Sequence, residues 1–316
     1  INRSITGTGL VQTLKILKKK HLHKLVIKKI RSGTRVYDWK IPSEWNIKNA
    51  YIIDESGKKI IDYKKNNLHI VSYSTKINKY INKKELNKHL FSVPKKPNAI
   101  PYVTSYYKRF WGFCISHKER KKIKGNKFFV HIDSNFSQKG HLSYGELYLK
   151  GKSSKEILIS TYVCHPSMAN NEISGPVIST FIAKYCKSIE RKYSMRFIFV
   201  PETIGAIAYI NKNFKNLKKN VIASYCLTCI GDERNYSLIT SKYGDSLSDL
   251  TAQEALKKLK IKYKKYTFLD RGSDERQFNS FGVEIPMTVL SRTKFGNYPE
   301  YHTSLDDFKV VTEKGL

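Results

Sequence analysis

The hydrophobic and polar positions in the first third of the chain change spacing several times. Leucines recur at helical spacing in residues 8–20, which predicts a short amphipathic helix. Within residues 33–75 apolar and polar positions alternate in short runs, among them Ala50–Ile53 and Leu68–Tyr73, with turn signals between them. That pattern predicts several short strands. One further helix is predicted over Lys83–Leu90, before two prolines.

From about residue 127 the chain alternates between predicted strands and predicted helices. Phe128–Ile132 and Gly145–Leu149 have the pattern of two strands that pair with each other. Buried strands separated by helices follow, which is typical of a mostly parallel sheet with helices on both faces. The strands are predicted at Glu156–Val163, Met195–Val200, Val221–Ile230 and Ile285–Leu290, and the helices at Gly175–Ile189, from Ala206 onward, and at Ser246–Lys260. The predicted fold class is therefore α/β, with a mixed, mostly parallel sheet.

Size and composition fit a folded protein with a sizeable core. The chain has 316 residues and a hydrophobic fraction of 40%, which suffices for one large domain carrying a smaller insert. No run of about 18 apolar residues occurs, so we expect no membrane-spanning helix. The net charge of +32 invites a nucleic-acid interpretation, but the lysines are spread along the whole chain beside many Asn, Ile and Tyr residues. We therefore expect no specific nucleic-acid partner, and the sequence leaves formation of a homo-oligomer open.

The five cysteines bear on the cellular compartment. An odd, scattered set favours a reducing environment over a disulfide framework. No apolar stretch typical of a signal peptide follows Ile1, so we expect a cytoplasmic protein. Cys226 and Cys229 have the spacing of a metal-binding pair, but they lie in an apolar, strand-like run with no second pair. Buried thiols are the simpler interpretation of these two residues.

Polar side chains follow directly after two of the predicted buried strands. His165 comes after Glu156–Val163, and Glu202 comes after Met195–Val200. Sites in open α/β sheets lie at the carboxyl ends of the strands, so these two side chains are candidates for a common site. Imidazole and carboxylate are zinc ligands, and a carboxylate that is not bound to the metal can move a proton. A structural histidine and a glutamate that caps the next helix are the alternatives.

Further candidates lie in the loops near these strand ends. Asn171 and Glu172 follow His165 before the next predicted helix, and Asp274 and His302 stand in the last loops of the chain. Two histidines and several carboxylates fit a zinc centre that keeps one position for water. For Asp274, an ion pair with a neighbouring arginine is the alternative.

Several sequence stretches together carry a resemblance to a known family. They are Arg3–Gly7, Asp38–Ile47, Pro101–Cys114, Ser160–Pro176, Pro201–Tyr209, Arg271–Phe278 and Tyr298–Asp307. The chain resembles a bacterial aminopeptidase-like family of polysaccharide-biosynthesis gene clusters, which is related to the di-zinc bacterial aminopeptidases and the glutaminyl cyclases. The resemblance implies a zinc-exopeptidase-like core formed by residues 1–31 and 101–316. It also implies a smaller β-rich inserted domain at residues 32–100.

The resemblance implies roles for individual residues as well. His165 and His302 match the first and the last histidine ligand of the wider superfamily. Asn171 stands where a bridging aspartate ligand is expected, and Glu202 matches the general base. Two further carboxylate ligands are replaced by Thr203 and Thr228. Because a neutral side chain is a poor partner for a second dication, the resemblance implies at most one firmly bound zinc ion.

The third metal ligand and the general base stay open among three acidic side chains. Glu172, Glu202 and Asp274 are candidates for the third ligand. If Glu202 binds the metal, the base role passes to Glu172 or Asp274. Asp274 matches the aspartate of a Ser-Asp-His motif in which Glu275 replaces the histidine.

Four side chains are candidates for substrate binding. Arg3 and Arg271 are candidates to hold a substrate carboxylate, with surface ion pairs as the alternative. Tyr106 and Trp111 belong to an aromatic segment that either lines a substrate pocket or forms part of the core of the insert.

These features together predict a zinc-dependent, metallo-aminopeptidase-like hydrolase. It would cleave an amide or peptide bond of a small substrate with metal-activated water. The alternative is a catalytically degenerate protein of the same fold that serves as a binding or scaffold protein in polysaccharide biosynthesis. The replaced ligand positions motivate this alternative.

Overall fold

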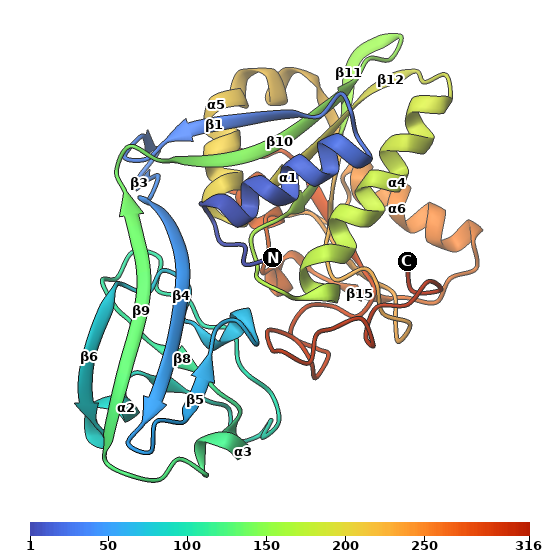
Figure 1. The fold of residues 1–316 in the computed structure, drawn as a ribbon. Helices are drawn as coiled ribbons and strands as arrows, with labels where there is room; N and C mark the ends of the chain where they lie inside the picture. Colours follow the sequence, from blue (N-terminus) through green and yellow to red (C-terminus); the bar gives the residue numbers. More distant parts are fainter.

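An eight-stranded mixed sheet forms the centre of the larger of two lobes (Figure 1). The computed structural model describes residues 1–316. In sheet order the strands are β1 (Val26–Arg31), β10 (His141–Leu149), β12 (Tyr193–Val200), β11 (Ser153–Tyr162), β13 (Val221–Leu227), β16 (Met287–Ser291), β14 (Ser237–Ile239) and β15 (Lys264–Tyr266). The pairs β11–β12, β11–β13, β13–β16 and β14–β15 are parallel, and the other three are antiparallel. The predicted mixed, mostly parallel sheet is confirmed.

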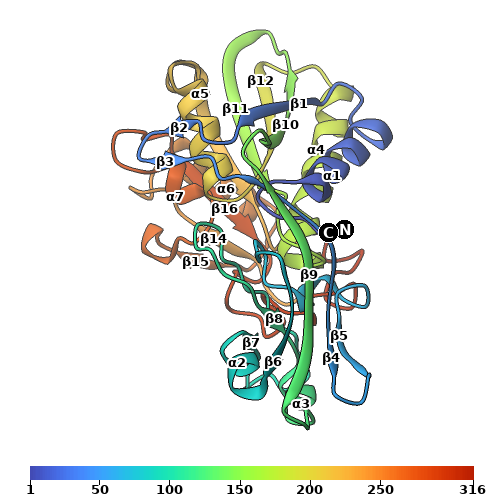
Figure 2. The ribbon, with the colours of Figure 1, turned by 60° about the vertical axis from the view of Figure 1, so that its left-hand side comes forward.

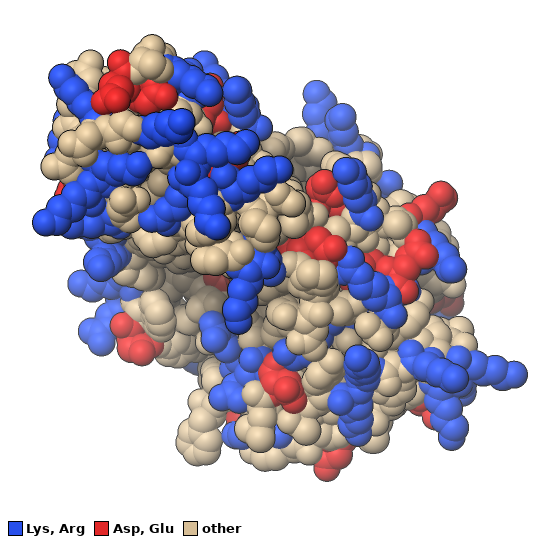
Figure 3. Space-filling view, turned by 90° about the horizontal axis from the view of Figure 1, so that it is seen from below, with Lys and Arg blue, Asp and Glu red and all other residues tan.

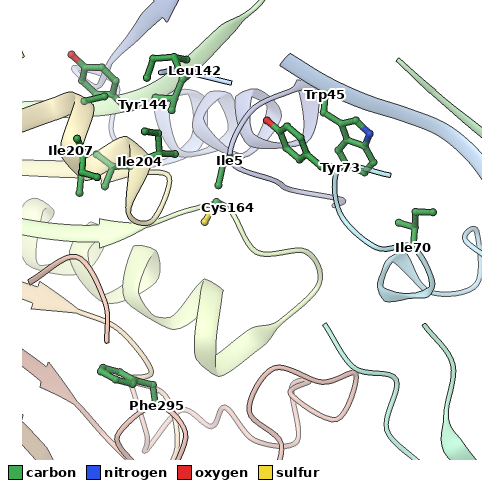
Figure 4. Packing of buried hydrophobic residues seen from close by; sticks show 14 of the residues in the cluster. Ile5, Trp45, Ile70, Tyr73, Leu142, Tyr144, Cys164, Ile204, Ile207 and Phe295 are labelled. Atoms are coloured by element: carbon green, nitrogen blue, oxygen red, sulfur yellow. The ribbon is translucent and has the colours of Figure 1, made fainter. Parts of the chain in front are cut away.

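Helices cover both faces of this sheet. One face carries α1 (Thr8–Lys20), α4 (Ser174–Ser188) and α6 (Leu247–Lys258), and the other carries α5 (Ile204–Asn220) and α7 (Glu275–Phe278). Because side chains alternate along a strand, Phe197 and Phe199 of β12 pack in the cluster with the leucines of α1. Ile198 belongs to the opposite cluster with α5, where Ile204 and Ile207 lie near Leu142 and Tyr144 of β10 (Figure 4). The helices predicted over residues 8–20 and 175–189 are present within one residue of their predicted bounds.

A second, four-stranded antiparallel sheet forms the smaller lobe. Its strands, in sheet order, are β5 (Lys59–Asp62), β4 (Glu44–Asp54), β9 (Lys127–Ser137) and β6 (Ile77–Asn82). Figure 2 shows β9 running from the larger lobe through the length of the smaller one. Shorter elements complete the chain: β2 (Arg35–Val36), β3 (Trp39–Lys40), α2 (Lys83–Lys88), β7 (Leu90–Phe91), β8 (Phe113–Cys114) and α3 (His117–Arg120). We call residues 44–137 the small lobe.

One predicted strand pairing and one predicted strand in this region are wrong. The strand at Phe128–Ile132 does not pair with Gly145–Leu149, because β9 pairs with β4 and β6 while β10 pairs with β1 and β12. The partners of β9 lie far away in sequence, and the alternating pattern of one strand does not show which distant strand pairs with it. Leu68–Tyr73 is not a regular strand either, because the Asn66 side chain accepts the Leu68 amide and caps a 3₁₀ turn.

The division of the chain into a core and an inserted unit remains a proposal. Since β9 completes the sheet formed by β4, β5 and β6, we propose that the inserted unit reaches the end of β9 rather than residue 100. No helix of the structure combines the length and the apolar character that a membrane span requires.

Lysine and arginine side chains cover much of the surface. Figure 3 shows them on both lobes, most densely on the small lobe. Between residues 58 and 127 the acidic side chains are Asp62, Glu85 and Glu119 alone. The expected absence of a specific nucleic-acid partner stays a prediction.

A buried ion network joins the strands of the large sheet. The guanidinium of Arg196 on β12 binds both carboxylate oxygens of Glu156 on β11 at 2.6 and 2.8 Å, and it lies 3.2 Å from Glu146 on β10. Glu146 also accepts a 2.6 Å hydrogen bond from Tyr209 on α5 and pairs with Lys28 on β1. Both carboxylates are buried, so each depends on the shared guanidinium for compensation.

Replacing this guanidinium destabilises the sheet. We expect Arg196→Met to lower the free energy of unfolding by about 3 kcal/mol, because Glu156 is then buried without a cation and Glu146 keeps only Lys28. Urea denaturation measures the loss. The control is Lys192→Met just before the same strand, whose exposed ammonium makes no ion pair, and it should change stability by less than about 0.5 kcal/mol. Equal losses in the two variants would contradict the role assigned to the network.

Candidate metal centre

The carboxyl ends of β11, β12 and β13 bring the candidate residues together. His165 follows β11 and Glu202 follows β12, and their side chains approach to 3.6 Å between Nε2 and Oε2. The ring of His302, from the loop after β16, lies 5.2 Å from the ring of His165, centroid to centroid. His165 and His302, which are more than a hundred positions apart in the chain, therefore meet at one edge of the sheet. His165 and Glu202 lie together there, as their positions after two strands predicted.

A buried ion pair sets the orientation of His165. Its Nδ1 lies 3.1 Å from Oε2 of Glu172, and because a carboxylate only accepts, Nδ1 carries the proton and donates. Oε1 of Glu172 lies 3.3 Å from Nε of Arg3, which also donates to the His165 carbonyl at 2.8 Å. Desolvation lowers the pKa of His165, but Glu172 and Glu202 outweigh it, so the pKa is raised. In its neutral form His165 carries its proton on Nδ1, so Nε2, which faces Glu202, is free for a metal ion.

The loop after His165 is a π-helical turn at Ala169–Ile173 that buried carboxylates hold in place. Asp306 accepts the amides of Asn170 and Asn171 at 2.6 and 2.9 Å. Asp232 accepts the Asn170 side-chain amide at 3.1 Å. These bonds place Glu172 against His165 and turn the side chain of Asn171 inward, where it is 1% exposed. Turns of this kind are frequent at functional sites.

The Asn171 side chain joins a neutral cluster around a tyrosine hydroxyl. Its Nδ2 donates to Tyr162 at 2.7 Å, and Oγ1 of Thr228 donates to the same hydroxyl at 2.5 Å. The thiol of Cys229 lies 3.5 Å from Thr228 and 3.7 Å from the Tyr298 hydroxyl. Hydroxyl, amide and thiol groups therefore contact one another here, and the Tyr298 hydroxyl connects them to the carboxylate of Asp306, to which it donates at 2.9 Å.

Glu202 and Asp274 form the acidic side of the site. Oε1 of Glu202 accepts a 2.9 Å hydrogen bond from Ser273, and Oδ1 of Asp274 accepts the Thr203 amide at 2.8 Å. Burial, helped by the charge of Glu202, raises the pKa of Asp274 well above its usual range, and burial also raises the pKa of Glu202. Glu275 accepts the amides of Gly272 and Ser273, so its carboxylate holds this loop.

Backbone strain gathers at the same place. Ser167, Thr203, Cys229 and His302 all have positive φ, at 56°, 64°, 48° and 55°. Non-glycine residues seldom adopt this region, and it costs on the order of 1 kcal/mol or more each time. The bond from the Thr203 amide to Asp274 stabilises one of these conformations. The remaining strain is typical of a site whose geometry is selected for chemistry.

The donor set fits a single metal ion near His165 and His302. Four buried acceptors lack a hydrogen-bond partner: Asn171 Oδ1, Glu172 Oε1, Asp274 Oδ2 and His302 Nε2. Burial lowers the pKa of His302 to about 3, so its imidazole is neutral and available as a ligand at neutral pH. Several buried carboxylates face only one buried guanidinium, that of Arg3, and a dication would balance them.

A second grouping of ligand atoms lies behind His165. Cys164, His165 and Glu172 present such atoms within 4.8 Å of one another. They surround Nδ1, however, which already donates to Glu172, and burial raises the pKa of the Cys164 thiol well above its usual range. A protonated thiol is a poor ligand, so the Nε2 side of His165 is the better metal position.

The predicted substrate-binding residues fall into two groups. Tyr106 lies one residue layer behind the histidines, with its hydroxyl 2.7 Å from that of Tyr102. Arg3 lies in the site, bound to Glu172. Trp111 stacks on His89 in the small lobe, and Arg271 lies over Phe268. Neither side chain has a hydrogen bond or ring contact with His165 or His302.

Three tyrosines that contact the histidine rings were not named individually as site residues. Tyr102 lies 5.1 Å from His165 and 5.3 Å from His302, Tyr162 lies 5.1 Å from His165, and Tyr301 stacks on His302 at 3.9 Å, all between ring centroids. Tyr162 and Tyr301 stand within three residues of a candidate histidine, and this proximity is the signal that could have found them. Tyr102 begins the aromatic segment that was predicted either to line a substrate pocket or to form part of the core of the insert, and the loop that carries His302 brings it into place.

Comparisons with known proteins identify the family of this chain. The family model described as a domain of unknown function, DUF4910, matches residues 1–316. The chain belongs to this family. A curated relative of this DUF4910 chain, from Clostridium acetobutylicum, is named as a polysaccharide biosynthesis protein with aminopeptidase-like domain. It is 41% identical over 319 residues, which cover 100% of this chain and 72% of the relative.

Solved structures show that the DUF4910 chain has an aminopeptidase-like fold. The crystal structure of a Clostridium acetobutylicum protein assigned as a peptidase matches with a TM-score of 0.96 at 41% identity, over 100% of this chain and 74% of that one. BSAP, a zinc aminopeptidase from Bacillus subtilis, matches with a TM-score of 0.67 at 14% identity, over 99% and 87%. A peptidase M28 precursor from Shewanella amazonensis matches with a TM-score of 0.61 at 10% identity, over 97% and 83%. The predicted family resemblance and fold class are confirmed.

Removing the Arg3 guanidinium should destabilise the site. We expect Arg3→Met to lower the free energy of unfolding by about 3 kcal/mol, because Glu172 is then buried without its cation. Arg3→Lys should recover part of this loss, since it restores the charge but not the hydrogen bond to the His165 carbonyl. Chemical denaturation measures both variants, with Arg31→Met at an exposed position as the control. A stable Arg3→Met variant would show that Glu172 does not depend on Arg3.

Proposed function

We propose that this chain is a single-zinc hydrolase that cleaves an amide or peptide bond of a small substrate. The arrangement that carries the proposal is the pair His165 and His302, with Glu202 3.6 Å from the free nitrogen of His165. A zinc ion bound by both histidines would supply Lewis acidity for the substrate carbonyl and would acidify water. The aminopeptidase-like fold and the zinc aminopeptidase among its structural neighbours support this choice of metal.

Glu202 is the general base of the proposal. Its side chain is 23% exposed, so it reaches both the buried histidine and the open side of the site. Ser273 binds Oε1 and leaves Oε2 facing His165. From this position Glu202 takes a proton from the attacking water and passes it to the leaving amine. A raised pKa brings the carboxyl closer to neutral pH, which favours such transfer in both directions.

The other two acidic candidates take supporting roles. Glu172 orients His165 through Nδ1 and is itself paired with Arg3, so it positions a ligand and does not act as the base. The unpartnered Oδ2 of Asp274 is the third ligand that we propose. Asn171 contributes at most a neutral amide oxygen.

A single ion is proposed because neutral groups stand where a second ion would need carboxylates. Thr203, Thr228 and Asn171 stand at positions where the resemblance implies carboxylate ligands. Thr228 and Asn171 instead donate to the Tyr162 hydroxyl, and the backbone amide of Thr203 donates to Asp274. The same network is the observation that favours the second candidate function, a binding or scaffold protein without catalysis. The five free, buried cysteines support a cytoplasmic location, and the name of the Clostridium relative supports a place in polysaccharide biosynthesis.

Zinc content tests the metal site. We expect the purified protein to bind about one zinc ion per chain. His165→Ala and His302→Ala should each abolish tight binding, and Glu172→Gln should weaken it by about 10- to 100-fold because His165 loses its orienting partner. Elemental analysis and titration with a chromophoric chelator measure these values. Cys164→Ser is the control that should keep the zinc, and loss of zinc in this variant would move the ion to the other side of His165.

Hydrolysis tests the role of Glu202. We expect Glu202→Gln to keep its zinc and to lower kcat by at least about 100-fold on aminoacyl p-nitroanilides, because the amide cannot accept the proton of water. Glu284→Gln, at an exposed position outside the site, serves as the matched control. A zinc-loaded wild-type protein that hydrolyses none of these substrates would support the scaffold function instead.

A further inference from the structure

Tyr102 of the small lobe covers both candidate histidines. Its ring lies 5.1 Å from that of His165 and 5.3 Å from that of His302, and the two imidazoles are 5.2 Å apart. The three rings therefore form a nearly equilateral triangle of pairwise contacts. Aromatic rings at such spacings are in van der Waals contact, so no ring-sized gap remains among them.

The backbone fixes the position of Tyr102. Its amide donates to the His302 carbonyl at 2.9 Å, and Pro101 forms a bridge with Thr303. Ile100 and Ser304 exchange two further hydrogen bonds, of 2.9 and 3.0 Å. The segment around Tyr102 and the loop that carries His302 thus move as one piece.

A row of aromatic side chains supports the ring from behind. The hydroxyls of Tyr102 and Tyr106 lie 2.7 Å apart, and the ring of Tyr106 meets Tyr73 edge-on at 5.3 Å. Tyr73 stacks on Trp45 at 5.5 Å, and Figure 4 shows this pair beside Ile5 of the N-terminal segment. Trp45 and Tyr73 are at most 2% exposed, so the row is anchored in the core and Tyr102 cannot easily yield to a ligand.

A cavity lies on the far side of this row from the histidines. A cavity of about 260 Å³ is lined by Tyr73, Tyr106 and Tyr107, together with Lys108. The walls of the principal cavities include neither His165 nor His302. Tyr102 and Tyr106 therefore separate the histidines from the cavity, and the partly exposed Glu202 marks the side from which the histidines are approached.

We propose that Tyr102, held by Tyr106, is the wall of an acyl-binding subsite that admits only small groups. The substrate class is an amide whose acyl part is of glycyl or alanyl size. A bulky acyl group on the zinc-facing carbonyl would collide with a ring that the core holds in place. This inference rests on the proposed function, and it assigns to the small lobe the selection of substrates for a site built by the large lobe.

Binding of hydroxamates tests the wall without turnover. Alanine hydroxamate and phenylalanine hydroxamate both chelate zinc and differ by one ring, and calorimetry on the zinc-loaded protein gives their Kd values. We expect the wild type to bind the alanine compound at least about tenfold more tightly, and Tyr102→Ala to reduce this ratio to about twofold or less, because the phenyl ring then occupies the space that the Tyr102 ring has left. Tyr102→Phe keeps the ring and should keep the wild-type ratio. Tyr107→Ala, at a 54% exposed neighbour of the same segment, is the matched control.

Chemical accessibility provides a second test that needs no metal. Diethyl pyrocarbonate should modify His165 and His302 of the metal-free protein at least about tenfold faster in Tyr102→Ala than in the wild type or Tyr107→Ala, since the covering ring is gone. Mass spectrometry of the two peptides measures the rates. If Tyr102→Ala keeps the wild-type ratio of the two hydroxamate Kd values, or if it leaves the modification rates of the two histidines unchanged, Tyr102 is not the wall of the subsite. Failure of both hydroxamates to bind the zinc-loaded wild type would instead count against the proposed function, while the modification rates would still decide on Tyr102.

Discussion

The burial of several carboxylates beside a single guanidinium is the constraint on which the site depends. Glu172, Asp274 and Glu275 are fully buried, and Arg3 is the one buried cation that pairs with any of them. Each carboxylate meets this cost differently. Glu172 uses Arg3 and His165, Glu275 uses backbone amides, and Asp274 keeps one oxygen without a partner. Protonation of Asp274, whose pKa burial raises, or a bound dication would compensate the remaining charge, and imidazoles are ligands that zinc prefers.

Different parts of the fold contribute the side chains of the candidate site. Parallel strands end side by side, so His165 and Glu202 meet although they come from different strands. The N-terminal segment contributes Arg3, and the small lobe contributes Tyr102, which touches both histidines. The large lobe thus carries the candidate metal ligands, and the small lobe places Tyr102 against both histidines.

Sequence reasoning worked where local pattern decides the outcome and failed where distant segments meet. The strand–helix alternation located β11 and β12 and the residues His165 and Glu202 that follow them, because the local sequence pattern determines which strands are buried and where they end. His302 and Asn171 were candidates from their loops near strand ends, but their individual ligand roles came only from the resemblance, since loop positions carry no periodic signal. The partner of β9 and the place of Tyr102 were missed for the same reason, because both depend on pairing across more than 40 residues. The contacts of Glu172 with Arg3 and His165, which favour a positioning role for this carboxylate over that of a base, join segments far apart in the chain and are not encoded in any local pattern.

The central claim is that zinc binds on the Nε2 side of His165 and not among Cys164, His165 and Glu172. X-ray absorption at the zinc edge distinguishes the two positions directly, because zinc–sulfur bonds of about 2.3 Å are longer than zinc–nitrogen bonds of about 2.0 Å. The account predicts two imidazole ligands with nitrogen and oxygen only in the first shell. A sulfur scatterer at about 2.3 Å, or a single imidazole, would contradict it.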